Sequence, residues 1–398
     1  MKYELLSKLF YKEPADYERR YQQRFESEFS VKLPIYIHGE QAFFTTPIEI
    51  INKTEKIYKM NNKVNNLINN LPIIAINFLI NKSLKDEITL TNEIEGVSST
   101  RKEIEDAVLN QSNSKKARFK GLAAKYIKLI HNNEIPLNFC EDIRKIYDDI
   151  VLDEIESNNA PDGKIFRKDF VHVVSATQKE KHRGVMPEEK IIEYMNCCLD
   201  IVKDDKLNML IKVAVFHYLF GYIHPFYDGN GRTSRFISSC LLKDELGILL
   251  SLRLSYVIKN NLKSYYNAFD ICNDMKNKGE ITSFILMFLT LLEEATNELF
   301  DELHDFGDRL SFYREFFENK MLKKNKKKLL FILCQNKLFG DTYTTINDLV
   351  EILEISGTLI REMLKELYEE GYVLKTKYGQ KIGYTANLIK IDELKDSV

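Results

Sequence analysis

The chain has 398 residues, of which 44% are hydrophobic and 29% are charged, and its formal net charge at pH 7 is −2. These values are typical of a globular protein of two or three domains, and they exclude nucleic-acid or membrane binding driven by overall charge. The six cysteines form no C-x-x-C pair, so neither a zinc site nor a disulfide framework is indicated. The N-terminus lacks an apolar signal core and every apolar run is too short to span a bilayer, so we expect a cytoplasmic protein without membrane contact.

Helical patterns dominate the chain as far as about residue 300. Residues 1–45 combine a charged amphipathic stretch with a β-like piece at Leu33–His38. Three helices are then expected, at Pro47–Asn70, Pro72–Asn81 and Leu84–Gly96. In the following core, helices are separated at 113–116, 132–136, 158–163 and 227–231. We therefore divide the chain into an N-terminal helical region at 1–96, a core at 97–310 and a C-terminal domain at 320–398.

A run of lysines marks the start of the C-terminal domain, with six lysines in the nine residues 320–328. Helices are expected beyond it at Leu329–Leu338, Thr345–Leu353 and Ser356–Glu370, followed by a hairpin at 372–385. This order resembles a winged-helix domain. Its third helix carries Arg361 and Lys365 among four glutamates, which disfavours DNA binding, without settling it, and favours contact with protein.

The most informative stretch is His224–Arg235, which reads HPFYDGNGRTSR. It combines a base that titrates near neutrality, a carboxylate of the kind that Mg²⁺ prefers, and glycines that let backbone N–H groups turn toward an anion. The apolar residues that follow predict a helix beginning near Gly231, so its positive end would face that anion. Arg232 and Arg235 lie on one face of this helix and suit phosphate oxygens.

This stretch resembles the signature HxFxDGNGRxxR of the Fic family at all eight fixed positions, and the likeness extends over about residues 50–300. The resemblance implies a mainly α fold, with a Fic-type helical bundle core, a small β-hairpin flap and the C-terminal winged helix. It also implies an enzyme, because most Fic proteins with the full motif transfer AMP from ATP to a hydroxyl of a protein. Mg²⁺ or Mn²⁺ and ATP are the implied cofactor and substrate.

The resemblance assigns a role to each motif residue. His224 would take the proton from the attacking Tyr, Ser or Thr hydroxyl, and Asp228 would hold the metal that bridges the α- and β-phosphates. Phe226 would anchor the loop in the core. The nucleotide-binding residues would be Asn230 with the Gly229 and Gly231 amides at the α-phosphate, Arg232 at the β-phosphate and Arg235 at the γ-phosphate.

A second motif lies upstream, where Thr91-Asn-Glu-Ile-Glu95-Gly96 resembles the [ST]xxxE[GN] inhibitory motif of Fic proteins. Thr91 and Glu95 share one helix face, and Gly96 is typical of a helix C-cap. A carboxylate in the last helical turn opposes the helix dipole, which makes sense if a cation lies opposite it. The resemblance names that cation as Arg235, and Glu95 would then block the γ-phosphate site. An ordinary solvated glutamate is the alternative.

Two further regions fit the same family. β-capable pieces around the polar stretch 175–181 predict a hairpin, and the resemblance implies that this flap, at 172–186, binds the target protein by strand addition. Tyr266 and Asn273 match best the positions that would hold adenine, although aromatic residues on a helix are more often core. His217 lies in the apolar helix Leu207–Ile223 and is expected to be a core histidine.

Three functions remain open at this stage. The first is a protein adenylyltransferase that is autoinhibited by Glu95 and Arg235. The second is a de-AMPylating enzyme in which Glu95 positions a water molecule. The third is a winged-helix regulator that senses nucleotide without turnover, which the intact His224 and Asp228 disfavour. The target protein and the oligomeric state, including a homodimer, are left open.

Overall fold

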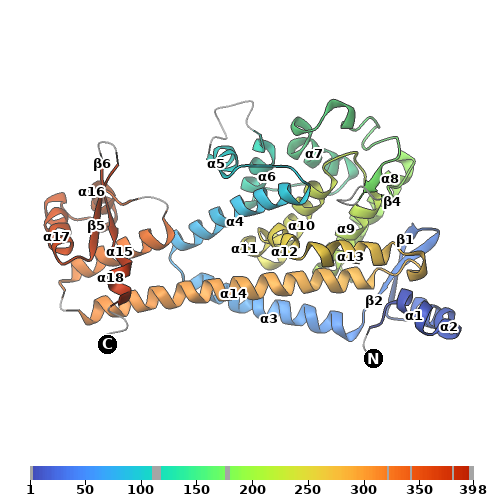
Figure 1. The fold of residues 1–398 in the computed structure, drawn as a ribbon, viewed down its shortest axis with the longest axis horizontal. Coiled ribbons are helices and arrows are strands. Elements are labelled where there is room, and N and C mark those ends of the chain that lie inside the picture. Colours follow the sequence, from blue (N-terminus) through green and yellow to red (C-terminus); the bar gives the residue numbers. More distant parts are fainter. Residues whose placement is uncertain are drawn as a thin grey trace. The chain divides into compact units, whose positions relative to one another are not determined.

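The computed structural model describes residues 3–109, 118–174, 180–320, 322–340, 343–378 and 381–393. Two compact units make up the chain, one formed by residues 1–62 and 83–298 and the other by residues 63–82 and 299–398. The described residues are mainly helical, with three two-stranded antiparallel hairpins, which confirms the mainly α fold (Figure 1). None of their helices combines the length and the apolar character that crossing a membrane requires.

The first unit begins with two helices and a hairpin, α1 Leu6–Lys12, α2 Pro14–Phe25, β1 Ser30–Ile37 and β2 Glu40–Thr45. The connecting residues His38 and Gly39 both have positive φ, as a two-residue type I′ turn requires. The sequence indicated only the first strand, because β2 buries three consecutive residues and so lacks the alternating pattern of a half-buried strand. Phe43 of β2 packs with Leu9 and Tyr21 of α1 and α2.

Two long helices follow, α3 Ile48–Asn70 and α4 Ile73–Ile94. The prediction of α3 is confirmed. The prediction of a break near residues 82–83 is wrong, because α4 continues through them. No glycine or proline lies there, and Asn81 and Lys82 point to solvent while Ser83 and Leu84 are buried, so the amphipathic pattern merely shifts its face. Gly96 has φ 72°, the conformation expected of a C-cap.

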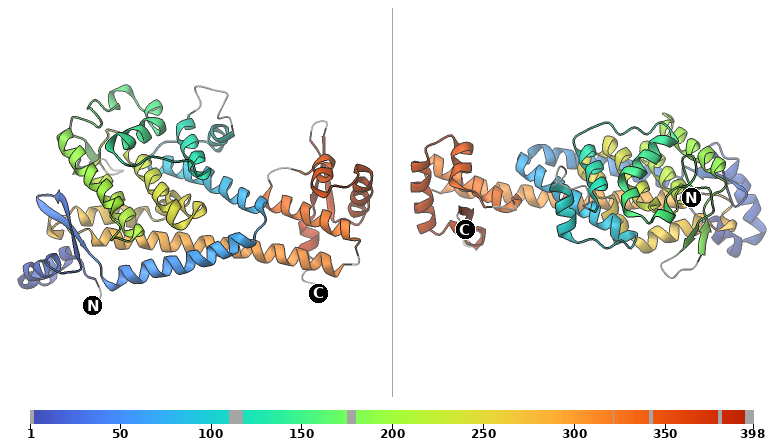
Figure 2. Two further views of the ribbon diagram at one scale, coloured as in Figure 1. Left: turned by 180° about the vertical axis from the view of Figure 1, so that it is seen from behind. Right: turned by 90° about the horizontal axis from the view of Figure 1, so that it is seen from above.

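The core of this unit is built around α9 Met209–Ile223 and α10 Asn230–Leu246 (Figures 1 and 2). Nearly every residue of α9 is buried, as expected of a helix that is apolar on all sides. The surrounding elements are α5 Arg101–Leu109, α6 Lys120–Ile130, α7 Cys140–Ile150, η1 Leu152–Glu154, η2 Ser157–Asn159, α8 Glu188–Lys203, α11 Ile248–Ser251, α12 Leu254–Asn260, α13 Leu262–Cys272 and η3 Met275–Asn277. The helix α14 Thr282–Asn319 begins in this unit and continues into the second from residue 299. The expected helix break at 113–116 lies outside the described residues.

The predicted flap is present as a hairpin, in which β3 His172–Val174 pairs antiparallel with β4 Glu180–Arg183. Residues 175–179, at the centre of the predicted turn, lie outside the described residues. Elsewhere in this unit, the first part of α3 and the first part of α14 lie side by side, joined by the ion pair of Lys53 Nζ and Glu293 Oε2 at 2.7 Å (Figure 1).

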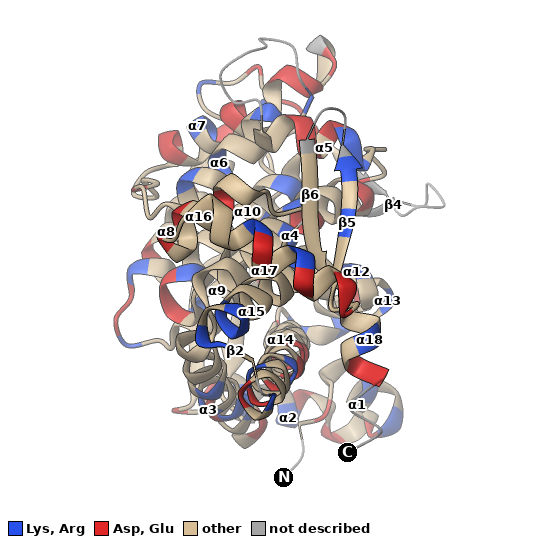
Figure 3. Ribbon diagram, turned by 90° about the vertical axis from the view of Figure 1, so that its left-hand side faces the viewer, with Lys and Arg blue, Asp and Glu red and all other residues tan. Residues whose placement is uncertain are grey.

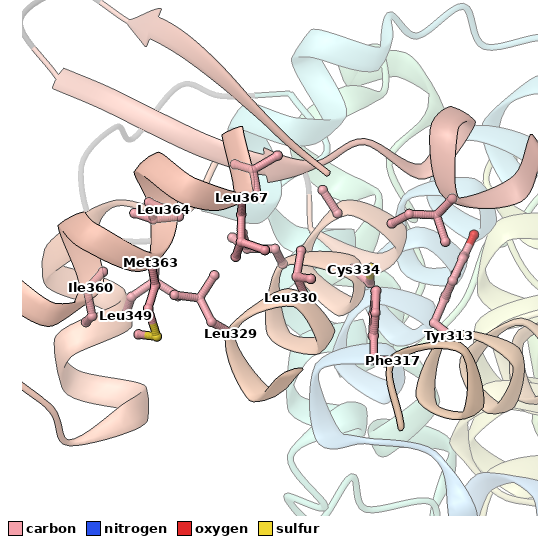
Figure 4. Close-up of a cluster of buried hydrophobic side chains, with 14 residues drawn as sticks. Tyr313, Phe317, Leu329, Leu330, Cys334, Leu349, Ile360, Met363, Leu364 and Leu367 are labelled. Carbon is pink, nitrogen blue, oxygen red and sulfur yellow. The ribbon is translucent and has the colours of Figure 1, made fainter. Parts of the chain in front are cut away.

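The second unit contains the predicted succession of three helices and a hairpin. These elements are α15 Lys324–Phe339, α16 Ile346–Leu353, α17 Gly357–Glu369, β5 Val373–Tyr378 and β6 Lys381–Ala386, followed by an unpredicted α18 Leu388–Glu393. Ser356 caps α17, because its Oγ accepts a hydrogen bond from the N–H of Leu359 at 3.3 Å. Leu329 and Leu330 of α15 pack with Leu364 and Leu367 of α17 in one apolar cluster (Figure 4).

Candidate active site

The loop between α9 and α10 carries the histidine of the signature. His224 ends α9 in the left-handed region, with φ 54° and ψ 63°, and its N–H donates to the Phe220 carbonyl at 2.9 Å. Its Nδ1 lies 3.4 Å from the Gly221 carbonyl oxygen. A proton on Nδ1 would serve that contact and leave Nε2 as the basic nitrogen, the tautomer that a general base needs.

Phe226 anchors this loop in the core. Its ring stacks on Tyr147 with centroids 3.7 Å apart. The rings of Phe226 and Phe166 lie in a T-shaped arrangement with centroids 5.5 Å apart. The Asn230 side chain holds the Phe226 backbone from both sides, since Oδ1 accepts from the N–H at 3.0 Å and Nδ2 donates to the carbonyl at 2.8 Å. Because both side-chain atoms of Asn230 serve the loop, its backbone N–H is the group that could face an anion.

Asp228 and the two glycines form the turn at the start of α10. Asp228 is exposed, and one of its carboxylate oxygens accepts from the N–H of Gly229 at 2.5 Å. Gly229 has φ 75°, and a Cβ there would lie 2.6 Å from Val151, so only glycine fits. The first turn of α10 therefore combines an accessible carboxylate with helix N–H groups, the arrangement that suits a metal-bound phosphate.

Arg235 lies one turn into α10 and is almost fully buried. Its Nη2 donates to Glu95 Oε1 at 2.8 Å and to the Thr91 carbonyl at 2.9 Å, and its Nε donates to Thr91 Oγ1 at 2.8 Å. A Cβ on Gly231 would lie 2.1 Å from Glu95 Oε1, so the carboxylate lies directly against the first turn of α10. Burial opposes the charge of Arg235, but the attraction of Glu95, together with Tyr265 and Glu87, outweighs burial and raises the pKa of the guanidinium.

Arg232 has a partner that the sequence analysis missed. Its Nη1 donates to Glu154 Oε2 at 2.8 Å, and Glu154 also accepts from the N–H of Phe119 at 2.8 Å. Burial raises the pKa of Glu154, and the Arg232 charge opposes that rise. No signal in the sequence indicates this pair, because Glu154 is one of several acidic residues that end α7 and η1.

Glu87 is a second residue that the sequence analysis missed. It lies on α4 two turns before Glu95, is completely buried and accepts from the Tyr126 hydroxyl at 2.9 Å and from the Ser255 N–H at 2.8 Å. Burial raises the pKa of Glu87, and these hydrogen bonds and the charge of Arg235 lower it in part. These bonds fix the helix that carries Thr91 and Glu95 against the core.

Of the two residues predicted to hold adenine, Tyr266 lies on α13 and Asn273 is the C-cap residue of that helix. Tyr266 is 47% exposed, and partial burial together with the Glu95 charge raises the pKa of its hydroxyl. Asn273 lies two helical turns further along, where its Oδ1 accepts from the Tyr218 hydroxyl at 2.7 Å. Tyr266 is therefore partly accessible, with its ring packed against Tyr265, whereas the side-chain carbonyl of Asn273 is engaged by Tyr218 of α9.

His217 is a core histidine, as expected. It is 1% exposed, with Nδ1 2.9 Å from Ser238 Oγ and Nε2 2.8 Å from the Tyr265 hydroxyl. Burial and the nearby charge of Arg235 lower the pKa of His217 to about 3. This histidine is therefore neutral at physiological pH and supports the helix pair from inside.

The buried neutral histidine makes stability depend on pH. In the unfolded chain His217 takes up a proton below about pH 6.5, whereas the folded protein resists protonation down to about pH 3. The contribution of His217 to the free energy of unfolding is therefore complete above pH 6.5. As the pH falls below that value, the free energy of unfolding decreases by up to about 1.4 kcal/mol per pH unit. Urea unfolding of the wild type and His217→Gln between these pH values should show a shallower pH slope in the variant; equal slopes would contradict the assignment.

The signature loop and the flap lie in a part of the chain that matches a known protein family. Residues 136–242 match the Fic/DOC family. The chain contains a Fic domain. A solved structure of a Fic family protein from Desulfovibrio desulfuricans G20 has the same fold, with a TM-score of 0.57 at 18% identity over 86% of this chain and 97% of that chain.

Curated relatives of the Fic domain are named protein adenylyltransferase Fic. The protein from Drosophila grimshawi is 27% identical over 187 residues, which cover 45% of this chain and 33% of that protein. The protein from Drosophila mojavensis is 30% identical over 106 residues, which cover 26% of this chain and 18% of that protein. The chain thus spans a third or less of the length of these relatives.

The Fic domain match contains the signature loop and the flap, whereas Glu95 and Tyr266 lie outside residues 136–242. Among the described residues, no group of three or more His, Cys, Asp or Glu side chains could hold a metal ion. Asp228 is the carboxylate of the signature loop itself. A metal held there would depend on substrate phosphates and water for its other ligands.

Proposed function

We propose that this protein transfers AMP from ATP to a Tyr, Ser or Thr hydroxyl of a protein, and that Glu95 restrains the reaction. The observation that carries the proposal is the junction of α9 and α10, where His224, the exposed Asp228 and Arg235 surround helix N–H groups. The relatives named protein adenylyltransferase support the same chemistry.

In this reaction the substrate hydroxyl oxygen bonds to the α-phosphorus of ATP, and the bond from that phosphorus to the β-phosphate oxygen breaks. His224 receives the hydroxyl proton, and pyrophosphate leaves. The N–H groups of the first turn of α10 stabilise charge on the α-phosphate, and Arg232 and Arg235 neutralise the leaving phosphates. Glu154 orients Arg232 through their ion pair.

A divalent metal fits this site as a partner of the nucleotide. Mg²⁺ uses one or two carboxylates together with phosphate oxygens and water, and Asp228 offers one exposed carboxylate beside the phosphate-binding turn. The metal would neutralise charge on the phosphates. The role of Asp228 would be to hold the metal in the turn that precedes α10.

The metal proposal predicts that Asp228→Ala lowers AMP transfer by about 10²-fold or more, because the phosphate charge loses its counterion. Transfer should also stop in excess EDTA and return with Mg²⁺ or Mn²⁺. The measurement follows protein labelling by α-labelled ATP in the Glu95→Gly background. Asp162→Ala is the matched control, since this carboxylate accepts from the hydroxyl of Tyr227 in the same loop without lying in the signature. Full activity in EDTA would contradict the proposal.

Removal of AMP is the second candidate, because Glu95 lies against the first turn of α10 with its side chain still 26% exposed. A carboxylate there could orient a water molecule whose oxygen bonds to the α-phosphorus while the bond from that phosphorus to the target's hydroxyl oxygen breaks. AMP and the free hydroxyl, which takes up a proton, are then released. Self-labelled Glu95→Gly protein, purified and then mixed with unlabelled wild type, tests this candidate. Release of labelled AMP by the wild type but not by fresh Glu95→Gly protein supports it.

The proposed partner of the flap is a segment of the target protein, bound as an added strand. We propose that the C-terminal domain, residues 320–398, is a winged helix. Both basic and acidic residues lie along its helix α17 (Figure 3). Lys375 and Lys377 lie on β5. Mixed charge on the helix that would enter a DNA groove favours a protein partner over DNA.

A further inference from the structure

Arg167 is a completely buried arginine between η2 and the flap. Among the described residues, the hydrogen-bond acceptors of its guanidinium are backbone carbonyl oxygens alone. A buried charge needs compensation, and here four carbonyl dipoles supply it in place of a carboxylate. Burial lowers the pKa of Arg167 to about 10, so the side chain stays charged at neutral pH.

One side of Arg167 holds the loop that carries the proposed base. Its Nε donates to the His224 carbonyl at 2.8 Å, and its Nη2 donates to the Ile223 carbonyl at 3.3 Å. Its backbone N–H donates to the Pro225 carbonyl at 3.2 Å. With the N–H of His224 bound to Phe220, the peptide groups on both sides of the His224 Cα are held, which maintains its uncommon left-handed backbone.

The other side of Arg167 holds both ends of the flap. Its Nη1 donates to the Asp169 carbonyl at 2.5 Å, and its Nη2 donates to the Val185 carbonyl at 2.8 Å. These residues flank β3 and β4, respectively. The N–H of Val185 also donates to the Ile223 carbonyl at 3.0 Å, so the flap and the loop meet at one guanidinium.

The segment that carries Arg167 is itself fixed. The Glu188 carboxylate at the start of α8 accepts from the N–H groups of Lys164, Ile165 and Phe166 at 2.7 to 2.9 Å. Phe166 in turn packs on Phe226 of the signature loop. Arg167 therefore extends from a rigid base, as a group that sets the position of its neighbours must.

We propose that Arg167 is a positioning residue that couples the flap to His224. By binding both flap ends and the carbonyl of the histidine, it sets the distance between the edge that would receive a target strand and the proposed base. The consequence for AMP transfer rests on the proposed function, whereas the coupling is a property of the fold. Arg167 acts through His224 and the flap and makes no contact of its own with substrate in this proposal.

Gly184 offers an independent way to disturb this contact. A Cβ at Gly184 would lie 2.3 Å from Arg167 Nη2, and the residue has no positive φ that would make alanine strained. Gly184→Ala should therefore displace the guanidinium without removing it. If the two residues act mainly through this contact, adding Gly184→Ala to Arg167→Ala should cause a much smaller further effect. The alanine at 167 removes the closest clash and leaves only the approach of the new Cβ to Val171 Cγ1 at 2.9 Å.

Hydrogen exchange of the full-length protein tests the coupling directly. We expect Arg167→Met to speed exchange at least tenfold at Val185 in the flap and at His224 in the loop together. Arg167→Lys should give a smaller increase, because an ammonium retains charge and three donors. Arg144→Met is the matched control, since Arg144 Nη1 donates to the Ile165 carbonyl at 2.8 Å but to neither segment. Faster exchange in one segment alone, or in neither, overturns the proposal.

Activity is measured separately in the Glu95→Gly background, with α-labelled ATP and a His224→Ala copy of the chain as acceptor. We expect Arg167→Lys and Gly184→Ala to lower kcat at least tenfold while the KM for ATP stays within about twofold. The positioning role is overturned if the KM for ATP rises by as large a factor as kcat falls. It is also overturned if the effect of Gly184→Ala is as large in the Arg167→Ala background as in the parent. If the Glu95→Gly parent transfers no AMP, the proposed function fails, and hydrogen exchange alone decides whether Arg167 couples the flap to the loop.

Discussion

Replacing His224 with alanine is expected to lower AMP transfer to protein by about 10²–10⁴-fold, the usual contribution of a general base. The His224 imidazole lies at the end of α9, next to the first turn of α10 where the phosphates would bind, whereas His217 is buried and engaged with Ser238 and Tyr265. Nucleotide binding should persist, because Asp228, Arg232 and the N–H groups of α10 are unchanged. Label transfer from α-labelled ATP and nucleotide affinity by calorimetry measure the two effects.

The control for this variant is His304→Ala. His304 lies on α14 and its Nδ1 is 3.1 Å from Asp308, so its loss removes an exposed imidazole from an unrelated surface. Transfer by His304→Ala should equal that of its parent. A His224→Ala protein that still transfers label at the parental rate would refute the general-base role and favour a nucleotide-sensing regulator.

Replacing Glu95 with glycine is expected to raise AMP transfer about tenfold or more. The glutamate holds Arg235 through the 2.8 Å ion pair and lies against Gly231, where the phosphates would bind. Releasing a restraint worth about 1.4 kcal/mol already gives that factor. The measurement is the initial rate of self-labelling and of target labelling with α-labelled ATP.

Glu93→Gly is the matched control for Glu95→Gly. Glu93 lies near the same helix end and pairs with Lys259, so its glycine variant loosens α4 without releasing Arg235. The rate should rise in Glu95→Gly and not in Glu93→Gly. Arg235→Ala should also show no gain, since it frees the glutamate but removes the phosphate partner. An unchanged rate in Glu95→Gly would make Thr91–Gly96 an ordinary helix end.

The residues of the signature could be recognised from the sequence because they are neighbours in one short stretch of the chain. His224, Asp228 and the glycines belong to one turn between two helices, and a turn of this composition has few ways to fold. The helices were predictable for a similar local reason, since the apolar pattern repeats along each one. The error in α4 arose where that pattern changed face without a helix-breaking residue at 81–84.

The sequence by itself determined the mainly α class, the loop with its proposed base at the start of α10, and the order of elements after residue 323. Only the tertiary structure decided which acceptors Arg232 and Arg167 bind. Glu154 is distant in sequence from Arg232, and the Val185 and His224 carbonyls are distant in sequence from Arg167. A buried guanidinium needs its donors satisfied, but any carboxylate or carbonyl brought near by packing can do so, and no local pattern specifies which one.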